Sequence, residues 1–435
     1  MTHTPPTDTS REPAPKVSRR ALLRSGALIA GTTAVGIGVG AVTQPRAPQK
    51  PHSPDHEFNG QLVETQSGTT QSTREPTLFG HEKVAFYGDR QSGVTTPAQA
   101  HLLLACFTVA DDLGIEGARR LLTVVSADIA DLTAGTQALA DTEPELGDHP
   151  SNLTVTVGVG WNFLHKAHLD DHIPGWLKPL PQYRIDQLED QWGQGDLVVQ
   201  ICGDDEVAVA HARRVITRQI KRWATPLWVQ RGFKGARNAQ PDGTTMRNLM
   251  GQVDGTANPS GQHADSVVWC PQDQGVWENG SSMVVRRIAM NLDTWDNVDR
   301  VAREDSLGRT LETGAPLTGT KEHDEPDFEA TNALGFPVIP SYSHIRRARS
   351  DNSKEVILRR AYNYDDGPLT GDSQSGLVFI SFQADVVAQY LPLQRRLDQL
   401  DALNEWTTPI GSAVFAILPG CQPGGYLGQG IVEST

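Results

Sequence analysis

The sequence predicts an α+β fold built from two ferredoxin-like units, because one order of elements occurs twice along the chain. In each half a strand and a helix are followed by two strands, a second helix and a last strand, which is the order of a ferredoxin-like sheet. Alternating apolar and β-branched residues indicate the strands, and apolar residues spaced three or four apart indicate the helices. With 435 residues, 38% of them hydrophobic, the chain is long enough for a core in each half.

The first half, which we place at residues 79–240, opens with the apolar run HLLLACFTVA. A helix-like segment, GARRLLTVVSADIADLTAG, separates this run from the β-branched alternation of LTVTVGVG. The patterns predict strands over 101–110, 153–160, 195–203 and 226–233, and helices over 117–135 and 206–224.

The second half, residues 241–435, repeats the order more loosely. Two such units can pack sheet to sheet around a shared pocket, as in a dimeric α+β barrel. Loops on a rigid scaffold usually carry function, so the long loop that opens the second unit is of interest. The patterns predict strands over 281–292, 355–364, 376–383 and 412–418, and helices over 294–309 and 385–400.

Paired arginines precede a mildly apolar run at the N-terminus. The tripeptide SRR is followed by residues 21–42, which are rich in glycine, alanine and threonine. This pattern is typical of a twin-arginine export signal, which we place at residues 1–45. A membrane anchor is the alternative, but the glycines and threonines make a weak span. Residues 46–78 have the composition of a disordered linker. We expect export to the periplasm or the cell exterior, with no stable membrane insertion after signal cleavage.

The charge balance and the cysteines exclude several classes of protein. A net charge of −14 and a pI near 5.4 argue against a nucleic-acid binder, which would carry basic stripes. The cysteines lie far apart without a Cys-x-x-Cys pair, which excludes a zinc ribbon and a disulfide-dense scaffold but leaves one or two disulfides open. They are Cys106, Cys202, Cys270 and Cys421.

A single carboxylate, Asp254, stands among small residues in the stretch GQVDGTANP. One interpretation is a simple turn, because glycine adopts positive φ freely and aspartate bonds to its own backbone. The other is a catalytic carboxylate on a backbone that comes close to a flat ligand. The stretch alone leaves both open.

Most of the histidines have no chemical context. The cluster HKAHLDDH, with His165, His168 and His172, has no second set of ligands nearby, so a solvated helix edge is the better interpretation. His344 stands alone in PSYSHIRRARS, ahead of a pair of strands. Composition alone favours a hydrogen-bonded structural role for it.

Two adjacent arginines, Arg359 and Arg360, lie in the predicted strand ILRRAYNY. Strand alternation sends their side chains to opposite faces, so one of them points inward. A buried guanidinium needs an anion or hydrogen-bond acceptors. Structural salt bridges and a cation that faces a ligand are both open.

Six stretches from about Phe86 to the C-terminus resemble, in the same order, the motifs of the dye-decolourising haem peroxidases. They are FYGDRQSGVTTPAQAH, RNLMGQVDGTANP, GRTLETGAPL, HIRRA, ILRRAYNY and GLVFISFQAD. The GxxDG element alone would be weak. GxxDG followed by HIR and a strand arginine about fifteen residues on, behind a twin-arginine signal, is specific. The resemblance is greatest to the exported bacterial branch that includes deferrochelatase-like proteins of iron uptake.

The resemblance implies one b-type haem per chain, held between the two halves. His344 would be the proximal iron ligand, and Asp385 the carboxylate that bonds to it and makes the imidazole more electron-donating. Arg309 would contact a haem propionate. The backbone against the porphyrin would be that of Gly255, Thr256 and Ala257.

The resemblance also implies the reaction. Asp254 would be the distal acid and base that moves a proton between the oxygens of hydrogen peroxide, and Arg359 would stabilise charge as the O–O bond breaks. Arg360 would then face away. The electrons would come from dyes, phenolics or other organic donors, and a homo-oligomer is left open. Because a pocket sized for peroxide excludes bulky donors, these would be oxidised at surface tryptophans or tyrosines; candidates are Trp161, Trp269, Trp277 and Trp406.

Two departures from the family pattern stand near the site. Residues 349–351 are Arg-Ser-Asp where relatives often have Asn-Pro-Arg, which puts the haem contacts of that loop in question. Ala361 stands where relatives often have Gly or Asn, so the pocket would depend more on Asp254 and Arg359.

Two other functions compete with a peroxidase. The first is a haem-handling protein, deferrochelatase-like, that releases iron from haem for uptake. His344 would serve both roles, whereas Asp254 and Arg359 favour peroxide turnover. The second is an exported ferredoxin-like binding protein without haem, which would be colourless when purified.

Overall fold

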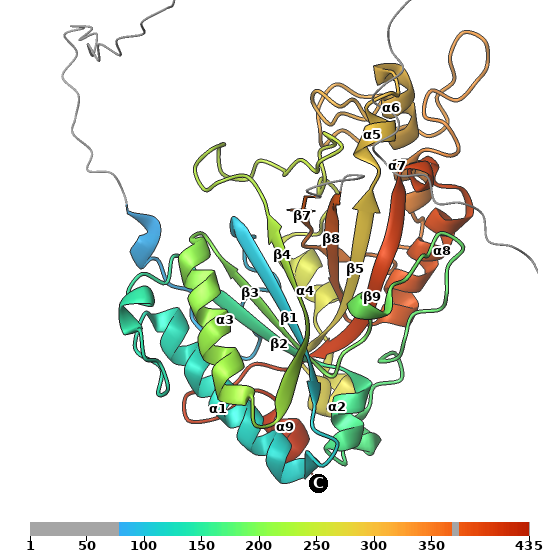
Figure 1. Ribbon diagram of the computed structural model, residues 1–435. Helices are drawn as coiled ribbons and strands as arrows, with labels where there is room; N and C mark the ends of the chain where they lie inside the picture. Colours follow the sequence, from blue (N-terminus) through green and yellow to red (C-terminus); the bar gives the residue numbers. More distant parts are fainter. Residues whose placement is uncertain (1–77, 368–373, 435) are drawn as a thin grey trace, which may run out of the picture. The chain divides into compact units, whose positions relative to one another are not determined.

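The computed structural model describes residues 78–367 and 374–434 (Figure 1). The predicted signal, 1–45, and all of the predicted linker except residue 78 lie outside the described residues. Among the helices that the structure describes, none combines the length and the apolar character that a membrane crossing requires.

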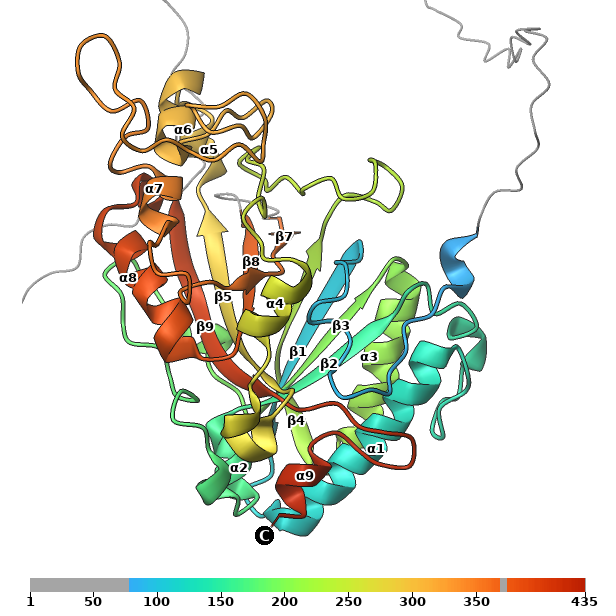
Figure 2. The ribbon, with the colours of Figure 1, turned by 180° about the vertical axis from the view of Figure 1, so that it is seen from behind.

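The N-terminal half is a four-stranded antiparallel sheet in the order β2-β3-β1-β4, within the described residues. Figures 1 and 2 show α1 and α3 beside this sheet, and α2 (Trp161–Lys166) follows β2. The order matches the ferredoxin-like prediction. The elements are β1 (His101–Val109), α1 (Gly114–Ala134), β2 (Thr154–Val159), β3 (Leu197–Gly203), α3 (Glu206–Ile220) and β4 (Ala224–Phe233).

The C-terminal half repeats this order. Strand β9 pairs with β5, β5 with β8, and the other edge of β8 is occupied by two short strands, β6 and β7. The strands are β5 (Ser281–Met290), β6 (Leu358–Arg359), β7 (Tyr362–Asp365), β8 (Ser375–Gln383) and β9 (Thr407–Ile417). The helices are α4 (Gly261–Val268), α5 (Leu292–Trp295), α6 (Arg300–Leu307), α7 (His344–Ala348), α8 (Leu391–Leu400) and α9 (Gln429–Val432).

The two half-sheets join at both edges. Strand β2 pairs with β9 at Gly158 and Val159, and β4 pairs with β7 at Phe233. Within the described residues, eight strands therefore close into a ring in the order β5-β9-β2-β3-β1-β4-β7-β8. This is the barrel that the sequence predicts. The two half-sheets share only a few paired residues at each join, so each half still forms a distinct sheet.

Apolar side chains fill the space between the two half-sheets. Leu104 of β1 and Val198 of β3 meet Met283 of β5, Ile380 of β8 and Phe415 of β9 in one buried cluster. Because strand side chains alternate, the neighbouring residues point to the outer faces. The interior is thus a packed core, and a large ligand has to lie outside it.

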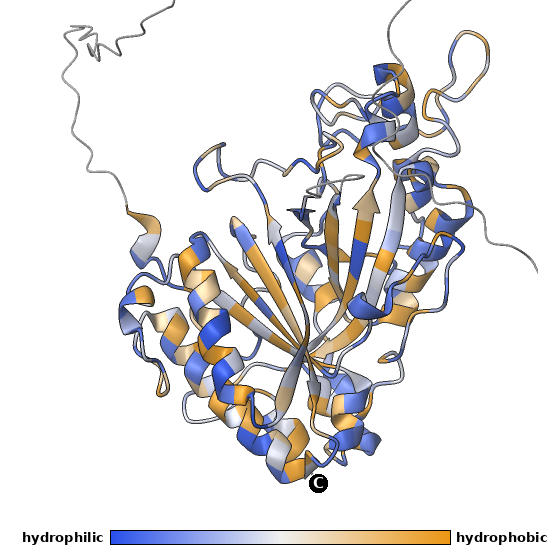
Figure 3. Ribbon diagram, in the orientation of Figure 1, coloured by the Kyte–Doolittle hydropathy of each residue, from blue (hydrophilic) through white to orange (hydrophobic). Residues whose placement is uncertain are grey.

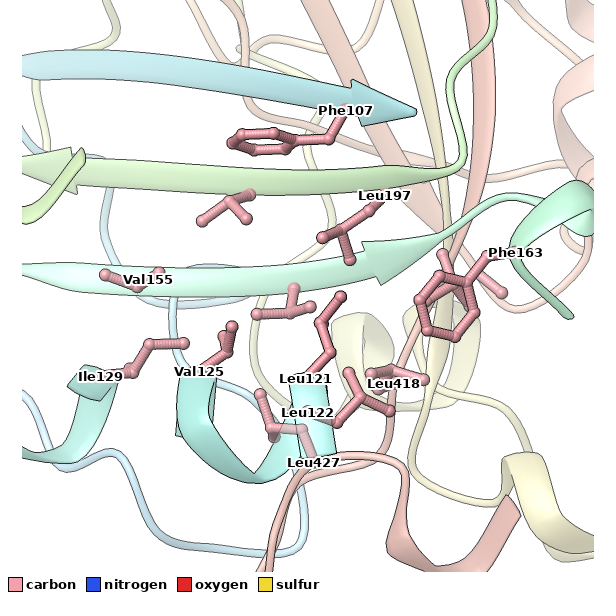
Figure 4. Close-up of a cluster of buried hydrophobic side chains, with 14 of the residues drawn as sticks. Phe107, Leu121, Leu122, Val125, Ile129, Val155, Phe163, Leu197, Leu418 and Leu427 are labelled. Atoms are coloured by element: carbon pink, nitrogen blue, oxygen red, sulfur yellow. The ribbon is translucent and has the colours of Figure 1, made fainter. Parts of the chain in front are cut away.

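On the outer face of the N-terminal half, α1 packs against the strands (Figure 4). Leu121 and Val125 of α1 contact the cluster that contains Phe107, Val155 and Leu197. Figure 3 shows the strands coloured largely hydrophobic, whereas hydrophilic colours recur along α1 and α3. This pattern is the amphipathic spacing on which the helix predictions depended.

The prediction of one continuous helix over 294–309 was wrong: the segment forms two short helices, α5 and α6, each started by a capping side chain. The Asn291 side chain accepts a hydrogen bond from the backbone of Thr294 and starts α5, and Asp299 accepts one from Ala302 and starts α6. Such caps favour a new helix start over continuation.

The disulfides that the sequence leaves open are absent, since all four cysteines are buried free thiols.

Asp128 is buried on α1 with little to stabilise its charge. Gln219 of α3 donates to Oδ1 at 3.4 Å, while Oδ2 has no hydrogen-bond partner among the described residues. Burial raises the pKa of Asp128 from its ordinary value of 3.8 to about 6. The folded state therefore holds an extra proton between these pH values, and the free energy of unfolding falls as the pH rises through this window.

Replacing Asp128 with Asn should stabilise the fold by about 1–3 kcal/mol at pH 7.5, because the amide removes the cost of the buried charge. Chemical denaturation at several pH values would measure this, and the gain should shrink towards pH 4. Asp242→Asn, in an exposed loop, is the control. If Asp128→Asn stabilised the fold equally at every pH, the raised pKa of Asp128 could not be the cause.

Candidate active site

A cavity of about 690 Å³ lies on the outer face of the C-terminal half-sheet. Ile288 of β5 and Leu377 and Phe379 of β8 line it from the sheet, and residues of α7 and α8 line it as well. The N-terminal half contributes Ile185. The resemblance implied a position between the two halves; the structure corrects this, because the interior of the ring is already filled. The volume is in the range of small-molecule and cofactor sites.

Asp254 lines this cavity from a loop that folds back on itself. Its backbone N–H donates to the Met246 carbonyl at 2.8 Å, and a bridge joins Arg247 to Val253. Gly255, directly after it, has a φ of +131°, which a residue with a side chain adopts only under strain. The glycine is therefore required by the backbone, and it brings main chain to the cavity wall.

Arg359 and Asp254 are in contact. The Nη1 of Arg359 donates to Asp254 Oδ1 at 3.0 Å, and the two side chains are 25% and 13% exposed. Arg360 points the other way and donates to the Thr96 carbonyl and to Gln99 Oε1 inside the ring. Strand alternation predicted that the two side chains take opposite faces, and they do; that Arg359 is the one at the site was implied by the resemblance.

His344 is the first residue of α7 and also lines the cavity. Its Nδ1 lies 2.6 Å from Asp401 Oδ2, whose carboxylate is buried. Burial lowers the pKa of His344, but the charge of Asp401 and the hydrogen bond to it raise the pKa by more. Because the Asp401 carboxylate only accepts, Nδ1 carries the proton of this hydrogen bond, while Nε2 makes no hydrogen bond within the described residues.

The predicted partner of His344 was wrong. Asp385 does not line the cavity; its Oδ1 accepts from the backbone N–H groups of Val387 and Ala388 and caps the turn that leads to α8. Asp401 takes its place. Both aspartates stand at helix ends, so only the three-dimensional fold distinguishes them.

Arg309 is buried at the cavity wall, with 8% of its surface exposed. Its Nη1 donates to the carbonyls of Gly314 and Glu322, both at 2.7 Å. No carboxylate forms an ion pair with it among the described residues, and burial lowers the pKa of Arg309. A guanidinium in this state favours an anionic group in the cavity.

Two residues that bond to the cavity wall were not predicted individually from the sequence. Glu322, from a loop without periodicity, accepts at Oε1 from Thr245 at 2.6 Å and from Thr256 at 2.8 Å. It thereby holds the segment after Asp254. Asn258, in the same motif as Asp254, bonds to the backbone of Arg359. Thr256 and Ala257 line the cavity as predicted.

Residues 349–351, which the resemblance singled out, lie at the cavity. Arg349, Ser350 and Asp351 all line it, Arg349 pairs with Glu325, and Ser350 donates to Glu355 Oε2 at 2.7 Å. Bonds to Glu325 and Glu355 thus hold this loop at the cavity.

Of the candidate tryptophans, Trp406 has the closest connection to the cavity. Its ring lies 5.1 Å from that of Trp295, whose indole N–H donates to the carbonyl of the cavity-lining Met250 at 3.0 Å. Trp269 and Trp277 are buried, and Trp277 donates to a backbone carbonyl of the N-terminal half. Trp161 packs against the outer core of that half.

The chain matches two family models. Residues 91–234 match the model described as Dyp-type peroxidase, N-terminal, and residues 245–422 the model described as Dyp-type peroxidase, C-terminal. The curated Dye-decolorizing peroxidase of Thermobifida fusca (strain YX) is 35% identical over 365 residues, 79% of this chain and 84% of that protein. The Deferrochelatase of Escherichia coli (strain K12) is 34% identical over 378 residues, 81% of this chain and 88% of that protein.

Solved structures agree with this result. A DyP-type peroxidase from Cellulomonas bogoriensis superposes with a TM-score of 0.80 at 49% identity, covering 82% of this chain and 100% of that one. Ferric DtpA from Streptomyces lividans gives 0.79 at 38% identity, covering 82% and 98%. With both halves matched and these relatives aligned over most of their length, the chain belongs to the Dyp-type peroxidase family and is a haem peroxidase.

Proposed function

We propose that this chain reacts with hydrogen peroxide through Asp254 and Arg359, with haem b held in the cavity by His344. The observation that carries the proposal is the 3.0 Å contact between Arg359 and Asp254 at the wall of a cavity that His344 also lines. A carboxylate and a guanidinium in contact are the groups that proton movement and charge stabilisation require.

The residues of the cavity fit a haem. The apolar side chains of Leu377, Phe379 and Leu393 suit the faces of a macrocycle, and Arg309 offers a buried cation to a propionate. His344 offers Nε2 to the iron, while Asp401 fixes the tautomer that makes this nitrogen a ligand. When bound, haem supplies the iron at which the peroxide O–O bond is broken and through which the donor is oxidised.

Asp254 and Arg359 have separate tasks in this proposal. The Oδ1 of Asp254 is engaged by Arg359, so Oδ2 is the oxygen that moves the proton. It accepts a proton from one oxygen of hydrogen peroxide and returns it to the other, which leaves as water. The Arg359 guanidinium stabilises the negative charge that develops on the leaving oxygen, and the partly buried position strengthens this interaction.

Replacing Asp254 with Asn should lower the second-order rate constant for the reaction with hydrogen peroxide by about 10²–10⁴-fold, because the amide cannot act as a base. Stopped-flow absorption of the haem band after mixing with peroxide would measure it. Haem content should be unchanged, as it should be in the control Asp242→Asn. Full activity in Asp254→Asn would refute the proton role.

Replacing Asp401 with Asn should raise the rate of haem loss by about 10–100-fold, because the ligand imidazole loses its charged partner. Transfer of haem to an excess of an apoprotein acceptor gives this rate. Asp385→Asn is the matched control: asparagine caps as well as aspartate, and the residue does not contact His344. The opposite ranking of the two variants would restore the assignment made from the sequence.

We further propose that bulky donors such as dyes are oxidised at Trp406, which leads to the cavity wall through Trp295 and Met250. Trp406→Phe should slow dye turnover and leave the rate constant for hydrogen peroxide unchanged, because a phenyl ring is much harder to oxidise than an indole. The control is Trp269→Phe, which removes a buried indole N–H without a partner in the described residues. Equal dye turnover in the two variants would exclude Trp406.

Iron release from haem is the second candidate function, on the ground that a relative carries the name Deferrochelatase. Formation of metal-free porphyrin from the haem-loaded protein without peroxide would support it.

Export by the twin-arginine route stays a prediction, because residues 1–45 lie outside the described part of the chain. The N-terminal sequence of the mature protein would test it.

A further inference from the structure

The Asn258 side chain bonds to both polar groups of the Arg359 backbone. Asn258 Oδ1 accepts from the Arg359 N–H at 2.9 Å, and Asn258 Nδ2 donates to the Arg359 carbonyl at 2.7 Å. The two bonds fix which end of the amide is oxygen, because an N–H and a carbonyl require opposite partners. Asn258 therefore holds Arg359 by its main chain, separately from the contact between Asp254 and the guanidinium.

The backbone of Arg359 needs such a partner because β6 is short and lies at an edge. Arg359 stands opposite Ser381 of β8, but the hydrogen bond to β8 on this side comes from the next residue: the Arg360 N–H donates to Ile380 at 2.8 Å. The N–H and carbonyl of Arg359 point away from β8, as alternation in an antiparallel pair requires. The Asn258 amide supplies the bonds that a neighbouring strand would supply.

Asn258 is in turn fixed to the loop that carries Asp254. Its own N–H donates to the Gly255 carbonyl at 2.9 Å and closes a turn that starts one residue after Asp254. Gly255 permits this turn with its φ of +131°, and Thr256 inside it is held by Glu322. Asn258 thus connects the turn that follows Asp254 to the backbone of Arg359 through hydrogen bonds.

We infer that Asn258 is a positioning residue that sets Arg359 relative to Asp254 and is needed for fast reaction with peroxide. The inference rests on the proposed function of these two residues. Arginine has a long and flexible stem, so the contact at its tip alone leaves the main chain of a two-residue strand free to shift. A displacement of about 1 Å in a catalytic group can cost about 10²-fold in rate.

A double-mutant cycle tests this inference. The second-order rate constant for hydrogen peroxide is measured by stopped flow in the haem-loaded protein, in Asn258→Ala, in Arg359→Leu and in the double variant. Asn258→Ala should lower the rate constant by about 10–10²-fold. In the Arg359→Leu background the same change should have an effect of less than about twofold, because the group that Asn258 positions is gone. Reduction of the peroxide-oxidised protein by a small donor should be unchanged.

Two further variants separate positioning from general stability. Asn258→Asp keeps the acceptor for the Arg359 N–H and loses the donor to its carbonyl, so its rate constant should lie between those of the wild type and Asn258→Ala. Asn297→Ala is the control, since Asn297 donates to a backbone carbonyl at an exposed helix end far along the chain from Asn258.

Several results would overturn this inference. A normal rate constant in Asn258→Ala overturns the inference, and so do additive effects in the cycle, which would mean that Asn258 acts independently of Arg359. Loss of haem from both Asn258→Ala and Asn258→Asp would make Asn258 a residue of the fold and would also overturn it. A normal rate constant in Arg359→Leu would instead refute the proposed function itself.

Discussion

Two adjacent arginines at the end of one short strand determine how the site and the fold are connected. Arg359 faces the cavity and meets Asp254, while Arg360, 4% exposed, enters the ring and donates to Thr96 and Gln99 of the N-terminal half. A buried guanidinium tolerates few positions, because its donors must meet fixed acceptors. The side chain that anchors the strand to the N-terminal half thereby also fixes the face that Arg359 presents to the cavity.

The same alternation explains why the cavity lies outside the ring. In β8, Val378 and Ile380 join the interior cluster, whereas Leu377 and Phe379 line the cavity. One strand therefore lines a packed core on one face and the cavity on the other. The N-terminal half uses its outer face differently: Leu121 and Val125 of α1 pack there against Phe107, Val155 and Leu197 of the strands (Figure 4).

Local pattern was enough for much of this fold and for part of the site. The alternation in ILRRAYNY correctly predicted that Arg359 and Arg360 take opposite faces. The stretch around Asp254 left a turn and a ligand-binding backbone open, and in the structure Asp254 and Gly255 line the cavity. Asp401 was missed because its bond to His344 spans 57 residues, and no local sequence pattern connects the two positions. Glu322 was missed for the same reason, since it reaches Thr245 and Thr256 from 77 and 66 residues away. Long-range hydrogen bonds are properties of the fold and not of a local motif.

Residues 349–351 lie at the cavity but are bonded apart from Asp254, Arg359 and His344. Ser350 bonds to Glu355, and Arg396 of α8 bonds to the same carboxylate at 2.6 Å, so residues 349–351 are held by a network at the cavity rim. Within the described residues, the hydrogen bonds from Glu355 to Ser350 and Arg396 do not reach Asp254, Arg359 or His344. Around the contact between Asp254 and Arg359, Asn258 bonds to the Arg359 backbone and to the Gly255 carbonyl, and Glu322 accepts from Thr256. The side chains of residues 349–351 therefore form part of the cavity rim without a hydrogen bond to Asp254, Arg359 or His344 within the described residues.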